Sequence, residues 1–137
     1  MTVDRASIER LLRELYSARV GGDREAVCRL FADDAKFEMA GASHPNPIMV
    51  KAIGVGEIRP LLTLMIKMFK LSDYEILTMI IDSPNAAVHW RAKVQSRITG
   101  AVVLTELVDL VEAGDNGRIV SYKEFFLGRH LGGEVKG

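Results

Sequence analysis

Two acidic residues in the last third of the chain have the spacing to form one chemical site. Residues 101–126 read AVVLTELVDLVEAGDNGRIVSYKEFF, with a strand-like run on each side of an Asn-Gly pair. Asn116-Gly117 favours a two-residue hairpin turn, because both central positions need φ > 0. With that turn Asp109 lies opposite Glu124, and directly opposed residues share a sheet face with Cβ atoms roughly 4.5–5.5 Å apart.

Two carboxyl groups held together on an apolar face are suited to acid–base catalysis. Burial and mutual repulsion both disfavour ionisation, so the pair is expected to hold one proton and to titrate as a unit. Such a pair offers a base and a proton donor in one site. The substrates it suits are small, apolar and oxygenated, such as an enolisable ketone, a polyketide or an epoxide.

A third strand brings an aromatic side chain to the same row. If Thr99-Gly100 forms a two-residue turn, Asp109 also faces Trp90. The same parity gives one face a mostly apolar wall: Ala92, Val94, Val103, Thr105, Leu107, Val111, Tyr122 and Phe126. The opposite face receives His89, Arg91, Lys93, Gln95, Arg97 and Glu106, with Lys93 opposite Glu106. Apart from Asp109 and Glu106, residues 102–111 are mostly apolar on both faces, which predicts a central strand covered on both sides.

Composition limits the classes of function. The chain has 137 residues, 48% of them hydrophobic, which is enough for one domain with a real core. Its 18 basic and 18 acidic residues form no basic stripe, so nucleic acid is not an expected partner. No apolar run is long enough to cross a bilayer and the N-terminus lacks the apolar core of a signal peptide. With the single Cys28 this predicts a cytoplasmic protein without membrane contact.

The remaining elements follow from periodicity, capping residues and breakers. Ile8, Leu11, Leu12 and Leu15 lie on one helical face that ends at Arg19. The expected single domain, residues 1–137, has this order: helix 1–20, helix 23–33, strand 35–39, loop 40–56, helix 57–70, antiparallel meander 73–127 and a fraying tail 128–137. That order predicts an α+β fold with helices packed on one face of a curved sheet.

Three side chains outside the row have unremarkable explanations. Cys28 on the second helix has no base or metal-ligating neighbour in the sequence and is expected to be a small buried side chain. His44 is expected to be an exposed loop residue, although it could reach the mouth of a pocket. His89 is expected at the surface or in an interface, and no cluster has metal-ligand spacing, so no metal and no cofactor are predicted.

Two blocks of sequence resemble the steroid delta-isomerases and the SnoaL-like polyketide cyclases. The segment GDREAVCRLFADDA, residues 22–35, is similar to the helix-two motif of the isomerases, and the segment from Val108-Asp109 through residues 117–121 to Phe126 is similar to their last hairpin. The resemblance implies the nuclear-transport-factor-like cone: a curved mixed or antiparallel sheet with three helices enclosing an apolar pocket, commonly dimeric through the outer sheet face.

The resemblance to the isomerases covers only part of their catalytic set. It places Asp109 on their protonated aspartic acid, a carboxyl group that its apolar surroundings keep neutral. Their base falls on Met39 and their oxyanion-hole tyrosine on Leu15. Tyr16 is one position away and turned by about 100° on a helix, so steroid isomerisation is not predicted.

The final strand also resembles that of the limonene epoxide hydrolases. Their W-R-D-Y-F compares with Tyr122-Lys123-Glu124-Phe125-Phe126, which places Glu124 on one of their two catalytic carboxylates. Their other carboxylate and its arginine have Arg91 and Lys93 as nearest matches, so the second acid is not reproduced in place.

These observations predict a candidate site and leave three functions open. Asp109 and Glu124 are the expected catalytic residues. The expected substrate-binding residues are Leu15, Tyr16, Met39, Leu62, Met65, Trp90, Leu107, Tyr122 and Phe126. The chain is then an acid–base enzyme (isomerase, cyclase or epoxide-hydrolase-like), a non-catalytic binding protein for a small apolar ligand, or a homodimeric interaction module. In the last case the outer face contributes Val102, Leu104, Val108 and Leu110.

Overall fold

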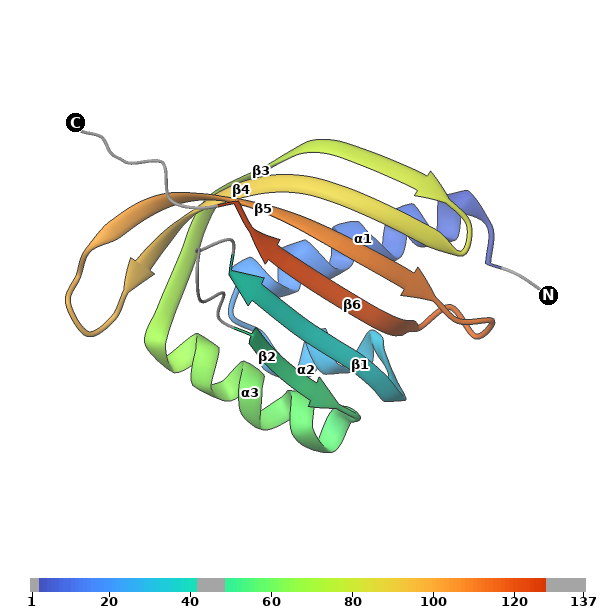
Figure 1. Cartoon of the computed structure of the whole chain (residues 1–137), viewed down its shortest axis with the longest axis horizontal. Coiled ribbons are helices and arrows are strands. Elements are labelled where there is room, and N and C mark those ends of the chain that lie inside the picture. Colours follow the sequence, from blue (N-terminus) through green and yellow to red (C-terminus); the bar gives the residue numbers. More distant parts are fainter. Residues whose placement is uncertain (1–2, 42–48, 128–137) are drawn as a thin grey trace.

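Three helices and one six-stranded sheet make up the computed structural model, which describes residues 3–41 and 49–127 (Figure 1). The expectation of an α+β fold is confirmed. The elements in chain order are α1 (Arg5–Val20), α2 (Arg24–Arg29), β1 (Phe31–Gly41), β2 (Met49–Ile53), α3 (Val55–Met68), β3 (Phe69–Asp82), β4 (Asn85–Ser96), β5 (Val102–Ala113) and β6 (Ile119–Phe126).

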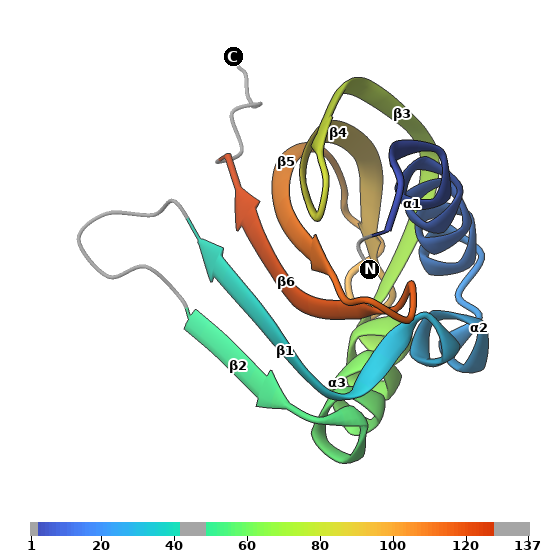
Figure 2. The same cartoon turned by 90° about the vertical axis from the view of Figure 1, so that its right-hand side faces the viewer.

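The sheet is mixed and strongly curved. Its strand order is β2-β1-β6-β5-β4-β3, and β1 runs parallel to β6 while every other neighbouring pair is antiparallel. Figure 2 shows β3, β4 and β5 curling over the helices, which all lie on the concave side of the sheet. This is the open cone that the resemblance implies. None of the helices in the described residues is long and apolar enough to span a membrane.

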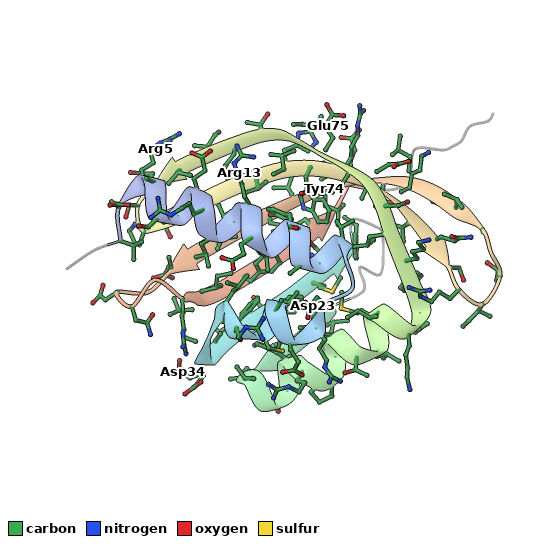
Figure 3. All side chains as sticks on the ribbon, turned by 180° about the vertical axis from the view of Figure 1, so that it is seen from behind. Arg5, Arg13, Asp23, Asp34, Tyr74 and Glu75 are labelled. Atoms are coloured by element: carbon green, nitrogen blue, oxygen red, sulfur yellow. The ribbon has the colours of Figure 1, made fainter. Side chains whose placement is uncertain are left out.

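Helix α1 covers the middle of the concave face. Asp4 caps it by accepting a hydrogen bond from the Ser7 backbone N–H at 2.8 Å. Its polar side carries exposed side chains such as Arg5 and Arg13, which Figure 3 shows on the helix surface away from the sheet. Its buried side consists of Ile8, Leu11, Leu12, Leu15 and Tyr16, a wide apolar stripe of the kind that holds a helix on a core.

Several expected boundaries are wrong. The predicted helix 23–33 ends at Arg29, because Phe31 already pairs with Ile119 of β6 and the chain continues as β1. The predicted loop 40–56 contains β2, whose residues pair with β1 and bury Ala52. His44 and the tail 128–137 lie outside the described residues. Helix α3 begins and ends two residues before the predicted 57–70, and β3 starts directly after it.

The β5–β6 register is confirmed although its turn differs from the prediction. The Gly114 backbone N–H donates to Arg118 O at 2.7 Å, so the loop has three residues between these two. Ala113 pairs with Ile119, while Glu112 pairs with Ser121, which leaves Val120 as an extra bulged residue. The longer loop and the bulge cancel, and Asp109 lies opposite Glu124 as expected.

The predicted β4–β5 register is wrong by two residues. The loop is longer than the predicted Thr99-Gly100 turn, since Ser96 N–H donates to Ala101 O at 2.9 Å. Asp109 therefore faces Val88, and Trp90 faces Leu107. A shift of two residues keeps every side chain on its face, so Trp90 remains on the concave side.

The same shift changes the pairs on the outer face. Lys93 lies opposite Leu104 and binds Asp73 at 3.0 Å, while Glu106 contacts His89 Nε2 at 2.8 Å; the predicted Lys93–Glu106 pair is wrong. Arg97 also departs from expectation, because its Nε donates to Ile66 O of α3 at 2.9 Å. No described residue covers the outer side of β5, where Val102, Leu104 and Leu110 are exposed.

Candidate functional site

The carboxyl group of Asp109 is fully buried on the concave face and has three hydrogen-bond donors on one oxygen. Oδ2 accepts from Tyr16 Oη of α1 at 2.6 Å, from Trp90 Nε1 of β4 at 2.8 Å and from the Tyr122 hydroxyl of β6. Oδ1 has no partner among the described residues. Donors from α1, β4 and β6 thus converge on one acid of β5.

Glu124 is equally buried and has a cation as its partner. Its Oε2 accepts from Arg19 NH1 at 2.6 Å and lies 3.2 Å from the Tyr122 hydroxyl, which also accepts from Arg19 NH1 at 3.2 Å. Oε1 has no partner among the described residues. Tyr122 therefore contacts both acids and the arginine, and it connects them into one network.

Arg19 is the only cation in this network, and it comes from the last turn of α1. Its side chain is 7% exposed, and its guanidinium carbon lies 5.4 Å from the centre of the Trp90 ring, a cation–π distance. The hydrogen bonds it makes to described residues all come from NH1. Nε and NH2 therefore remain able to donate to a ligand.

Burial dominates the electrostatics of the network. It raises the pKa of Asp109 well above the usual range, and the charge of Glu124 raises it further, while Arg19 and the Tyr122 hydrogen bond oppose this. Burial and then Asp109 raise the pKa values of Tyr16 and Tyr122. Burial lowers the pKa of Arg19, but Glu124, Tyr122 and Asp109 together raise it well above its usual value and keep the guanidinium charged.

An apolar cavity of about 380 Å³ lies between the helices and the concave face of the sheet. Arg19 and Trp90 are the members of the network that line it. Of the nine expected substrate-binding residues, six line the cavity: Met39, Leu62, Met65, Trp90, Leu107 and Phe126. Its volume is that of sites for small organic molecules.

The other three expected binding residues lie behind this lining. Leu15 is buried in the core, and Tyr16 and Tyr122 use their hydroxyl groups on Asp109. Asp109 and Glu124 are brought together as predicted, but neither is on the cavity wall. Arg19 and Trp90 connect the two, because they line the cavity and bond to Glu124 and Asp109 respectively. The described residues contain no group of three side chains that could hold a metal ion.

Sequence reasoning misplaced two members of the network. Tyr16 is not turned away, because α1 presents Leu12, Tyr16 and Arg19 at i, i+4 and i+7 on one face. Tyr16 thereby makes a tyrosine–aspartate contact, although the family resemblance aligns Leu15, and not Tyr16, with the tyrosine of the isomerases. Arg19 is expected from the sequence only as the polar end of an apolar stripe, whereas in the structure it pairs with Glu124. The signal that could have identified it is a cation at i+4 from Leu15, directed at a face that carries two acids.

Comparisons with known proteins agree with this fold. Residues 12–122 match the family model described as a SnoaL-like domain. No match to a curated protein was found. Among solved structures, a ketosteroid isomerase-like protein from Erwinia carotovora is 19% identical, with 90% of this chain and 95% of that chain covered and a TM-score of 0.66.

Two further structures are similar in fold. SalBIII, an epoxide hydrolase/cyclase-like enzyme with a role in pyran ring formation in salinomycin, is 17% identical, with 90% of this chain and 92% of that one covered and a TM-score of 0.73. A protein with a ketosteroid isomerase-like fold from Catenulispora acidiphila, in complex with trimethylamine, is 14% identical, with 83% and 82% covered and a TM-score of 0.70.

Proposed function

This chain belongs to the SnoaL-like domain family, and on that premise we propose that it binds a small, mainly apolar, oxygenated molecule in its cavity and converts it by acid–base chemistry. The observation that carries the proposal is the buried network of Arg19, Tyr122, Glu124 and Asp109, which begins with Arg19 at the cavity floor and continues behind it. Burying ionisable groups costs free energy, and this cost often exceeds the stability that their interactions return. Such clusters in clefts are therefore typical of functional sites.

The network is electrically neutral when it holds one extra proton. Two carboxyl groups face one guanidinium, so one negative charge is left unless one acid is protonated. We assign the proton to Asp109, whose pKa is raised. Its Oδ2 can then act as a carbonyl acceptor for the three donors, while Oδ1 carries the proton. Glu124 Oε1 is the other buried oxygen without a described partner and is the acceptor available for that proton.

The expected reaction uses Arg19 first and the acids second. A ligand oxygen accepts from Nε or NH2 of Arg19, which stabilises negative charge that develops on it. A proton then passes between the ligand and the Glu124–Tyr122 end of the network, which requires Glu124 or Tyr122 to exchange its bond to Arg19 for one to the ligand. Isomerisation of a ketone, cyclisation and epoxide opening all need this combination of a base and a proton donor.

The test separates binding from turnover. Trp90 is the only tryptophan and lines the cavity, so quenching of its fluorescence measures affinity for a panel of cyclic ketones, lactones and epoxides, with limonene oxide among them. For a compound that is turned over, Asp109→Asn and Glu124→Gln should lower kcat by roughly 10²–10⁴-fold and change affinity little. Glu112→Gln changes an exposed carboxyl on β5, the strand of Asp109; it is the control and should leave kcat and affinity unchanged.

A non-catalytic binding protein is the second candidate, and one observation favours it. Neither acid lines the cavity, so the network could serve only to hold Arg19 in place for a ligand oxygen. Saturable quenching of Trp90 without turnover of any compound in the panel would support this function over the enzyme.

A further inference from the structure

The charged residues that line the cavity are all cationic. They are Arg19, Lys70 and Arg97, and no acidic residue of the described chain is on the wall. The chain as a whole carries equal numbers of acidic and basic residues, so this bias is local. The three cations do not lie together, and their burial shows where each one is.

The cavity has a closed floor and an open mouth. Trp90, Leu62 and Leu107 on its wall are buried, and the Arg19 side chain beside Trp90 is 7% exposed. Phe69, Lys70 and Arg97, where α3 meets β3 and β4 ends, are exposed. Arg19 therefore belongs to the floor, and Lys70 and Arg97 to the mouth.

The floor disfavours an anion. Arg19 already neutralises Glu124 at 2.6 Å, and Asp109 lies behind Tyr122 in the same network. An additional carboxylate would bring a third acid to a single cation in a buried place, where like charges repel strongly. A neutral oxygen can accept from Arg19 without that cost.

The mouth favours an anion. Neither Lys70 nor Arg97 forms an ion pair with any residue in the described ranges. Arg97 is held in place by Nε on Ile66 O at 2.9 Å and by its backbone N–H on Met68 O at 2.8 Å. Its two terminal nitrogens have no described partner, and this fork matches the two oxygens of a carboxylate.

We infer that the ligand of this cavity is an amphipathic anion, with a carboxylate or similar group at Lys70 and Arg97, an apolar body along the wall and a neutral oxygen at Arg19. The inference rests on the proposed function, since it specifies the substrate class of the same site. Trp90 and Val94 both line the wall on β4, and four residues of a strand span roughly 13 Å, so the body is of medium length.

A matched pair of probes tests the inference by binding alone. Decanoate and decanamide share a chain and differ in charge, and quenching of Trp90 reports on both. We expect decanoate to bind about tenfold more tightly at low salt, as two partly exposed ion pairs predict. This preference should shrink as salt is raised from about 0.02 M to about 0.5 M.

Variants at the mouth locate the charge preference. Arg97→Gln and Lys70→Gln should each weaken decanoate and leave decanamide unchanged, and Arg118→Gln, an exposed arginine on the β5–β6 loop, should change neither. Because Arg97 also bonds to α3, circular dichroism must show a folded variant, and Lys70→Gln with the salt series carries the test if it does not.

The outcomes distinguish the inference from the proposed function. Equal affinity for the two probes, or a preference that survives both substitutions, overturns the inference and leaves the cavity proposal standing. Failure of both probes to quench Trp90 at any concentration below their solubility counts against both.

Discussion

Replacing each buried acid by its amide should give very different losses of stability, although the two side chains are neighbours. Glu124→Gln removes the charge that compensates Arg19, whose side chain is 7% exposed, and leaves a buried cation without its partner. Asp109→Asn should remove no charge, because we assign the extra proton to Asp109. The amide nitrogen can replace the protonated Oδ1 as the donor to Glu124 Oε1, and the amide oxygen can still accept from Tyr16 and Trp90 in place of Oδ2.

The expected magnitudes follow from these contacts. Breaking a buried ion pair by removal of one partner costs about 3–5 kcal/mol, whereas an isosteric change that preserves the hydrogen bonds should cost less than about 1 kcal/mol. Urea unfolding at pH 7 with a common m-value measures both losses as shifts in the midpoint. Glu112→Gln, exposed on the same strand as Asp109, controls for the substitution itself.

The comparison has a clear refuting result. If Asp109→Asn costs as much as Glu124→Gln, then Asp109 is ionised at pH 7 and its three donors stabilise a charge. If Glu124→Gln costs less than about 1 kcal/mol, the Arg19–Glu124 pair is exposed to solvent, and the two residues do not form a buried ion pair.

Three other predictions follow from the same structure. The pKa of Asp109 is raised in the folded state, so the stability that Asp109 contributes is fully present below its unfolded pKa of about 3.9 and is lost as pH rises through its folded pKa. In urea unfolding as a function of pH, the stability of Asp109→Asn relative to the parent should therefore increase above about pH 4 and then reach a plateau. In a Tyr74→Phe background the two remaining tyrosines, Tyr16 and Tyr122, should give no tyrosinate absorbance until well above pH 10 or until unfolding; ionisation near pH 10 in the folded protein contradicts their burial. We also propose a homodimer through the outer sheet face, where Leu110 is 46% exposed; sedimentation at micromolar concentration should show a dimer that Leu110→Glu dissociates, and a monomeric parent would exclude it.

The sequence was sufficient to predict the fold class, which follows from the order of the elements, and the faces of the strands, which follow from parity. Asp109 opposite Glu124 was predicted from a two-residue turn that does not form, yet the added loop residue and the bulge at Val120 restore the pairing. In the β4–β5 hairpin Trp90 pairs with Leu107, two residues from the predicted Asp109, and it remains on the concave face. Local turn signals therefore gave the correct faces, while loop lengths, which depend on sheet curvature, were wrong in both hairpins.

The parts that could not be predicted depend on contacts between distant segments. Phe31 lies in a segment with helical signals, but it pairs with Ile119 of β6, which lies 88 positions later in the chain and so is invisible to local periodicity. Arg19 forms its ion pair with Glu124 across 105 positions. A helical stripe shows which face is buried, but it does not show which residue of the sheet each side chain will contact.

Arg19 changes how the two family resemblances are to be understood. Asp109 and Tyr16 reproduce an isomerase-like tyrosine–acid contact, and Glu124 matches a carboxylate of the epoxide hydrolases, yet both acids are behind the lining. The cation comes from helix α1 here, and not from the β4 positions of Arg91 and Lys93, which are the nearest matches to the epoxide hydrolase pattern. In the function we propose, a ligand in this cavity meets a guanidinium first and a proton donor second. This order suits a substrate whose oxygen must be polarised before a proton moves, and it would let Asp109 and Glu124 act in the proposed reaction without contacting the resting ligand.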